Sequence, residues 1–239
     1  MSILDDFIDT ERNNYTTRDN NIFAFSLGQA LRYYKFLLIV AERYKKTSKK
    51  MVTTVNKMMN FSIKPHPMTT EEIRLMEEAN RLTTLVHLEI ESFYMFAKIF
   101  LDKIALFIQN YFGPERGISL VSHHKWVNNH EKFRLAKDLT YPQGFSQSII
   151  FLQEHICDYR DKQISHLYNQ KAIKGTSWGG TKQAKISSGG QLYPTETGSK
   201  VQVQNSYELL YLLQAIDTYI QQLITLIESN RAKTRFGLK

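Results

Sequence analysis

An arginine, an acid and a histidine lie close together in the segment that reads Asp158-Tyr-Arg160-Asp161-Lys-Gln-Ile-Ser-His166. Histidine, whose pKa is ordinarily about 6.5, can take up or release a proton at neutral pH. Arginine stays charged and can bind two oxygens of a phosphate at once, which stabilises charge as it builds there. These side chains could therefore cleave RNA without a metal, with His166 moving the proton of the 2′-hydroxyl, Arg160 on the phosphate, and Asp161 orienting either one.

The segment resembles the R-x(4–6)-H motif of HEPN domains (higher eukaryotes and prokaryotes nucleotide-binding), in which a polar residue follows the arginine. The wider resemblance covers a helical region from about Thr70 to Asn230. It implies a helical bundle that dimerises and, in active members, cuts RNA without a metal. Arg160, Asp161 and His166 are then the expected catalytic residues, and a toxin or antiviral defence effector with a neutralising protein partner is the expected kind of protein.

The motif leaves alternatives open. On an ideal α-helix, six steps place Arg160 and His166 about 120° apart. They converge only if the helix ends between them, if Arg160 reaches round, or if a second subunit completes the site. Arg160 and Asp161 could instead form a surface ion pair, with His166 capping a helix end. The competing function is a non-catalytic helical module that binds nucleic acid or a protein partner.

Composition favours an anionic partner. The chain has 31 Lys and Arg against 23 Asp and Glu, a net charge of +8, and nucleic acid is the commonest partner of such a surplus. RNA is the expected partner, and the expected substrate-binding residues are Lys162, Lys171 and Lys174. A single cysteine, Cys157, excludes a disulfide scaffold and a cysteine-built zinc site, and no cofactor is expected.

No apolar run approaches the roughly 20 residues that a bilayer-spanning helix needs, so no membrane partner is expected. The N-terminus, Met1-Ser-Ile-Leu-Asp-Asp, lacks the basic start and apolar stretch of a signal peptide, which favours a cytoplasmic location.

Other polar residues are weaker candidates for a site. His123, His124 and His130 cluster in the sequence, but adjacent histidines rarely share one metal ion, so a solvated loop and helix face is the favoured interpretation. Glu91, Lys98 and Asp102 fall on one stripe of the predicted long helix and are expected on its wet side. Glu89 and Lys103 instead fall among apolar positions, where buried polar groups would need partners.

Periodicity predicts the helices. Apolar residues at steps of three and four predict a helix from Asn20 to about Lys46, with helical character that extends toward Met59. Thr69 and Glu72 fit a capping box at the start of the next helix, and Gly113-Pro114 fits its end. A helix of that length must protrude, bend or break, and Thr83-Thr84 is the expected position of a bend or break.

Three further elements follow. The sequence predicts a short helix around 125–139, a helix that Ser146 or Ser148 caps and that runs toward His166, and a closing helix after Asn205. Residues 170–205 hold six of the eleven glycines, which predicts a β-hairpin around Ser188-Gly189-Gly190 or a mobile loop.

The predicted fold class is all-α, a helical bundle of four to five main helices with one β-hairpin-like or flexible glycine-rich insertion. The predicted domains are an N-terminal helical segment at 1–69 and a HEPN-like bundle at 70–239 with the insertion at about 170–205, and the two are expected to form one compact unit.

Overall fold

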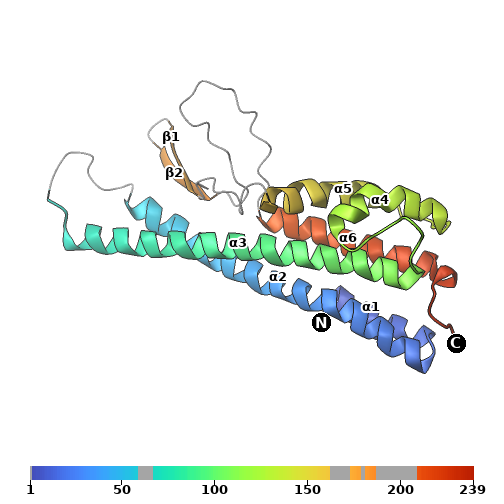
Figure 1. Cartoon of the computed structure of the whole chain (residues 1–239). Coiled ribbons are helices and arrows are strands. Elements are labelled where there is room, and N and C mark those ends of the chain that lie inside the picture. The colour runs from blue at the N-terminus through green and yellow to red at the C-terminus, as the bar shows by residue number, and fades with distance from the viewer. Residues whose placement is uncertain (1, 59–66, 162–172, 179–180, 187–208) are drawn as a thin grey trace, which may run out of the picture. The chain divides into compact units, whose positions relative to one another are not determined.

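The structure is a computed structural model that describes residues 2–58, 67–161, 173–178, 181–186 and 209–239. Within these ranges it is an all-α helical bundle with one small β-hairpin, which confirms the predicted fold class (Figure 1). The α-helices are α1 (Ile3–Glu11), α2 (Thr17–Met58), α3 (Thr70–Phe112), α4 (His123–Ala136), α5 (Phe145–Leu152) and α6 (Leu209–Ser229). None of these helices is both long enough and apolar enough to cross a membrane.

The chain divides into two compact units. The first unit comprises Met1–Leu37, Tyr94–Asp161 and Leu212–Lys239, and the second comprises Leu38–Phe93 and Lys162–Tyr211. The long helices α2 and α3 each contribute one part to either unit. The predicted division between residues 69 and 70 lies just before α3 and stays a prediction.

The ends of α3 confirm the predicted signals. The backbone N–H and the hydroxyl of Thr69 donate to Glu72 Oε2 at 2.7 and 3.0 Å, and the backbone N–H of Glu72 donates back to Thr69 Oγ1 at 3.3 Å. At the other end, Gly113 has a φ of 83°, a conformation that glycine adopts at little cost.

Helix α3 does not break at Thr83-Thr84, because it continues through both residues. Their hydroxyls donate to the carbonyls of Ala79 and Asn80 at 2.8 and 3.2 Å, so the two threonines are accommodated inside a continuous helix.

Helix α1 was not predicted, although its start carries a local signal. Ser2 caps the helix by accepting from the backbone N–H of Asp5, and the Asp5 carboxylate accepts from the backbone N–H of Ser2. This reciprocal pair is a capping box that spans residues 2–5, at the start of a helix whose Leu4, Phe7 and Ile8 are buried. Because residues 9–14 are mostly polar, the apolar positions of this short helix did not stand out as a helical pattern in the sequence.

The first unit is packed around buried aromatic rings. Phe23 on α2 lies against Phe107 and Tyr111 on α3, with ring centroids 5.7 and 6.1 Å apart, and Phe236 in the C-terminal segment lies 5.6 Å from Tyr111. A second cluster joins α4, α5 and α6, where Phe145 stacks on Tyr219 at 5.4 Å and Trp126 is fully buried. Edge and stacked contacts of this kind add to the burial of apolar area.

The helix after residue 144 starts and continues differently from the prediction. Gly144, with a φ of 77°, occupies the N-cap of α5, and Ser146 instead donates to Glu131 on α4 at 3.0 Å. The predicted cap by Ser146 or Ser148 is therefore wrong. The chain then continues as a π-helix, η2 (Gln153–Asp158), a wider helix that sequence periodicity does not signal and that recurs at functional sites.

The predicted insertion contains a hairpin, but not at the expected position. Strands β1 (Ile173–Trp178) and β2 (Thr181–Ile186) pair antiparallel, with Ile173 opposite Ile186 and Trp178 opposite Thr181. The two residues between these strands in the sequence are both glycines, and a Gly-Gly pair favours a two-residue hairpin connection. The sequence interpretation instead placed the hairpin at Gly189-Gly190. Residues 187–208 lie outside the described residues.

Candidate functional site

Two cations from different helices share one carboxylate in the first unit. Lys98 on α3 lies with its Nζ 3.0 Å from Asp161 Oδ2, and Arg160 donates from Nη1 to Asp161 Oδ1 at 2.9 Å. The side chains of Lys98, Arg160 and Asp161 are 28, 36 and 46% exposed, so all three can be reached by a ligand while partly withdrawn from water. Partial burial raises the pKa of Asp161, but the hydrogen bonds from Arg160 and Lys98 outweigh burial and lower that pKa below its ordinary value.

A second carboxylate, that of Asp102, lies one helical turn beyond Lys98 on α3. Its Oδ1 accepts the backbone N–H of His123 at 2.7 Å and so holds the first turn of α4. Burial raises the pKa of Asp102, against that hydrogen bond and the charge of Lys98. The expectation that this stripe is the wet side of the helix holds for Glu91, which is exposed, and is wrong for Lys98 and Asp102, which are partly buried and contact Asp161 and the first turn of α4.

A chain of hydrogen bonds fixes the tautomer of His123. The Asp158 carboxylate can only accept, so the 2.7 Å contact with it must come from the amide N–H of Gln153. Gln153 Oε1 then faces His123 Nδ1 at 3.1 Å, and this nitrogen must carry the hydrogen. Nε2 of His123 is left as an acceptor, buried and without a hydrogen-bond partner among the described residues.

His123 and His130 do not lie on a solvated face, which corrects the sequence interpretation. The side chain of His123 is fully buried and that of His130 nearly so, while His124 between them is exposed. Burial lowers the pKa of His123 to about 4, which keeps its imidazole neutral at neutral pH. The adjacent Cys157 is also buried, and burial raises the pKa of its thiol well above the ordinary value.

The buried imidazole predicts a pH dependence of stability. In the unfolded chain a histidine takes up its proton near pH 6.5, whereas His123 in the folded protein does so only near pH 4. The unfolded state therefore binds more protons across this window, and stability falls as the pH is lowered from 6.5 to 4, by about 1.4 kcal/mol per pH unit at most. Urea denaturation at several pH values between 4 and 6.5 measures the free energy of unfolding at each pH. The slope of this free energy against pH should be smaller for His123→Asn than for the wild type. It should be unchanged for the exposed control His124→Asn. Equal slopes in all three proteins would contradict a neutral buried His123.

The structure describes only part of the predicted site. It places Arg160 and Asp161 together, as neighbours in the sequence, and adds Lys98 to them. His166, Lys162 and Lys171 lie outside the described residues, and for Lys174 on β1 only the backbone is described. The angle of about 120° between Arg160 and His166 assumed an ideal α-helix with about 100° per residue. This assumption is wrong at Arg160, because the helix is a π-helix through Asp158 and again at Arg160 and Asp161.

Lys98 is the residue of this cluster that sequence reasoning placed wrongly. The signal available was its position on one stripe with Asp102, a cation and an acid at successive turns. Over the part of the chain that the structure describes, no three His, Cys, Asp or Glu side chains are grouped so that they could hold a metal ion.

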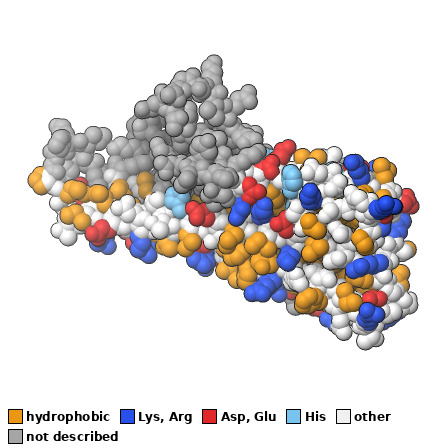
Figure 2. Space-filling model, in the orientation of Figure 1, with side chains coloured by type: hydrophobic (Ala, Val, Ile, Leu, Met, Phe, Trp, Pro, Cys, Tyr) orange, Lys and Arg blue, Asp and Glu red, His pale blue; other side chains and the backbone are white. Residues whose placement is uncertain are grey.

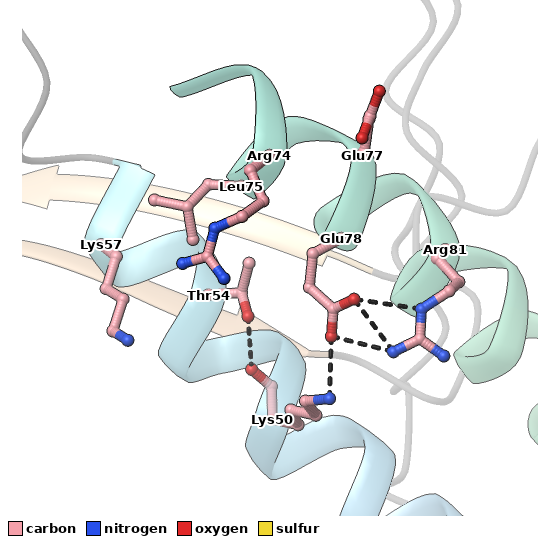
Figure 3. Close-up of a pocket in the computed structure, with 8 residues that line it drawn as sticks. All are labelled: Lys50, Thr54, Lys57, Arg74, Leu75, Glu77, Glu78 and Arg81. Atoms are coloured by element: carbon pink, nitrogen blue, oxygen red, sulfur yellow. Dashed lines mark hydrogen bonds and ion pairs between the residues drawn. The ribbon is translucent and has the colours of Figure 1, made fainter. Parts of the chain in front are cut away.

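The second unit has a polar pocket of its own, about 560 Å³ in volume, between α2 and α3 (Figure 3). Figure 3 shows Lys50 and Arg81 directed at the carboxylate of Glu78, at 2.8 and 2.9 Å, while Glu77 points away. Arg74 is held in the same way by Glu71 at 2.9 Å. Three of the cations that line this pocket, Lys50, Arg74 and Arg81, are thus paired with carboxylates of α3, as Lys98 and Arg160 are paired with Asp161 in the first unit.

The basic run on α2 is likewise partly neutralised within the second unit. Arg43 binds Glu89 at 2.8 Å, and the Glu89 side chain is buried, so the expected partner of this intruding acid is found. Lys46 pairs with Glu42 at 3.3 Å on the helix surface. A surplus of lysines counted in the sequence therefore overstates the positive field of this helix.

Comparison with known proteins gave no match: no family model, no curated protein and no solved structure is similar to this chain. The resemblance to HEPN domains thus stays an interpretation of the sequence.

Proposed function

We propose that the protein is a metal-independent ribonuclease of HEPN type, which acts as a homodimer on RNA in the role of a toxin or antiviral defence effector. The observation that carries the proposal is the pair of cations on Asp161. Asp161 engages only Nη1 of Arg160, so that within the described residues the Nε and Nη2 hydrogens of the guanidinium remain for a ligand. These are the groups that bind phosphate oxygens in pairs.

In the proposed reaction, His166 removes the proton of the RNA 2′-hydroxyl, and the resulting oxygen attacks the adjacent phosphorus. The bond from phosphorus to the 5′-oxygen breaks, and this leaving oxygen takes up the proton that the His166 imidazolium returns. Arg160 stabilises the negative charge that gathers on the phosphate during the attack. Asp161 positions the guanidinium, and the products are a 2′,3′-cyclic phosphate and a free 5′-hydroxyl.

Exposed aromatic side chains on the first unit support the homodimer. Phe25 on α2 is 70% exposed. Further along that helix, partly exposed Tyr33 and Phe36 pack against Phe96 of α3 with centroids 6.4 and 5.1 Å apart. Apolar side chains of this size on one face favour contact with another protein surface.

The test is an RNA cleavage assay with EDTA present. We expect single-stranded RNA to be cut into fragments that end in 2′,3′-cyclic phosphate, by a species whose mass from light scattering is about twice 27.9 kDa. RNA with 2′-deoxy nucleotides at the cut sites should resist, because it lacks the attacking hydroxyl. A requirement for a divalent ion would overturn the proposed chemistry.

If RNA binds but is never cut, the non-catalytic binding module becomes the better description. Its basis is the net charge of +8. On the face shown in Figure 2, however, acidic and basic side chains lie intermixed over the described surface, so that charge is not gathered there into one continuous patch. This distribution favours a localised phosphate site over a broad electrostatic surface.

A further inference from the structure

The two cations on Asp161 are arranged as if around a phosphate. Lys98 Nζ contacts Oδ2 of the carboxylate at 3.0 Å, and Arg160 Nη1 contacts the other oxygen, Oδ1, at 2.9 Å. One cation comes from the middle of α3 and the other from the helix that continues η2, so the packing of the first unit, and not a single helix, sets their separation. A phosphodiester, like a carboxylate, presents two charged oxygens on one central atom.

We propose that Lys98 is a second phosphate-binding residue, and that Lys98, Arg160 and Asp161 form a phosphate clamp. In this clamp the Asp161 carboxylate bridges the two cations until a backbone phosphate of RNA takes its place between them. The inference rests on the proposed function for the identity of the ligand, RNA, but it concerns binding and not the chemical step.

The surroundings of the clamp support an exchange of one anion for another. Asp161 is the most exposed of the three residues, so its carboxylate can rotate into water when a phosphate arrives. The side chains of Lys98 and Arg160 are more withdrawn from water. Exposed ion pairs are worth little, so the two contacts with Asp161 can be replaced by contacts with a phosphate at small cost.

A second carboxylate, that of Asp102, lies close to the two cations but is bound elsewhere. Its half-buried carboxylate lies near Lys98, and the charges of Lys98 and Arg160 both act to lower its pKa, against the effect of burial. With Asp102 committed to the backbone of His123, the second carboxylate cannot swing between the two cations. The position that Asp161 leaves is therefore open to an incoming phosphate.

Binding tests the clamp without relying on cleavage. The probe is a fluorescent 2′-O-methyl oligonucleotide, which keeps the phosphates but lacks the attacking hydroxyl, and the readout is anisotropy across a salt series. Lys98→Gln should weaken binding roughly threefold to tenfold and lower the slope of log affinity against log salt by about 0.7, the value for one phosphate contact with a single strand. The matched control is Lys103→Gln, a half-exposed lysine on the same helix.

Replacing the bridging carboxylate should act in the opposite direction. Asp161→Asn should tighten binding roughly threefold to tenfold, because the phosphate no longer competes with an internal anion. Glu154→Gln makes the same change in net charge at an exposed position of η2 and serves as the control. In the double variant Lys98→Gln/Asp161→Asn, the increase in RNA affinity caused by Asp161→Asn should be smaller. Only Arg160 then remains as a cation that the loss of the Asp161 carboxylate makes available to phosphate.

The clamp is overturned if Lys98→Gln binds no worse than Lys103→Gln, or if Asp161→Asn behaves like Glu154→Gln. Cleavage of unmodified RNA gives an independent readout of the positioning role: Asp161→Asn should lower KM and lower kcat together, because Arg160 binds more freely but is held less firmly. An absence of cleavage in every protein, with the binding differences intact, would refute the ribonuclease proposal and leave the phosphate clamp standing.

Discussion

His166→Ala is expected to lower RNA cleavage by a factor of about 10²–10⁴, the usual effect of removing a proton-transfer group, while RNA affinity stays nearly unchanged. The reason is that a neutral imidazole contributes little to phosphate binding, whereas the 2′-hydroxyl cannot attack readily while it keeps its proton. Single-turnover cleavage of a labelled RNA, together with anisotropy on its 2′-O-methyl analogue, separates the two effects.

Arg160 should behave differently, because it contacts the phosphate in both the ground state and the transition state. Arg160→Ala should reduce both cleavage and binding, and Arg160→Lys should restore only part of each, since an ammonium cannot reproduce the paired hydrogen bonds of a guanidinium. His124→Ala is the control, as His124 is an exposed histidine on α4. Cleavage by His166→Ala at the wild-type rate would show that the proposed proton-transfer group is wrong.

The largest effect on stability is expected from Arg231→Ala. Arg231, in the C-terminal segment, donates from Nε and Nη2 to both oxygens of Glu11 at 2.8 and 2.7 Å, and the Glu11 side chain is only 3% exposed. Removing the arginine leaves a buried carboxylate with Tyr15, whose hydroxyl donates to it at 2.5 Å, and Asn14 as its remaining donors. Breaking a buried pair in this way costs about 3 kcal/mol, or roughly 6–12 °C in Tm for a chain of this size.

Two further variants identify the cause of that loss. Glu11→Gln in the Arg231→Ala background should recover more than half of the lost stability, because it removes the unpaired buried charge. Lys233→Ala, two residues along, removes an ion pair with the almost fully exposed Asp138 and a hydrogen bond to its backbone carbonyl, and it should cost under about 1 kcal/mol. Thermal melts that rank Lys233→Ala with Arg231→Ala would mean that Glu11 is not held as described.

The elements that local chemistry controls could be predicted from the sequence. The capping box of Thr69 and Glu72, the stop at Gly113 and the apolar stripe of α6 all act within a turn or along one face, so the residues that decide them are close in the sequence. The same holds for Arg160 and Asp161, which are adjacent. Local signals also existed where the prediction failed, in Ser2 and Asp5 before α1 and in the two glycines between β1 and β2.

What the tertiary structure alone decided is which distant residues meet. Lys98 reaches Asp161 across 63 positions, His123 reaches Gln153 across 30, and Arg231 reaches Glu11 across 220. Each of these contacts depends on how one helix packs along another, and a shift by a single residue would turn the side chain by about 100° away from its partner. The sequence by itself therefore determined most of the helices and the Arg160–Asp161 pair. The burial of His123, the π-helix and the role of Lys98 follow from packing between helices. The free energy of that packing is a sum over many contacts between residues far apart in the sequence, so no local pattern predicts it.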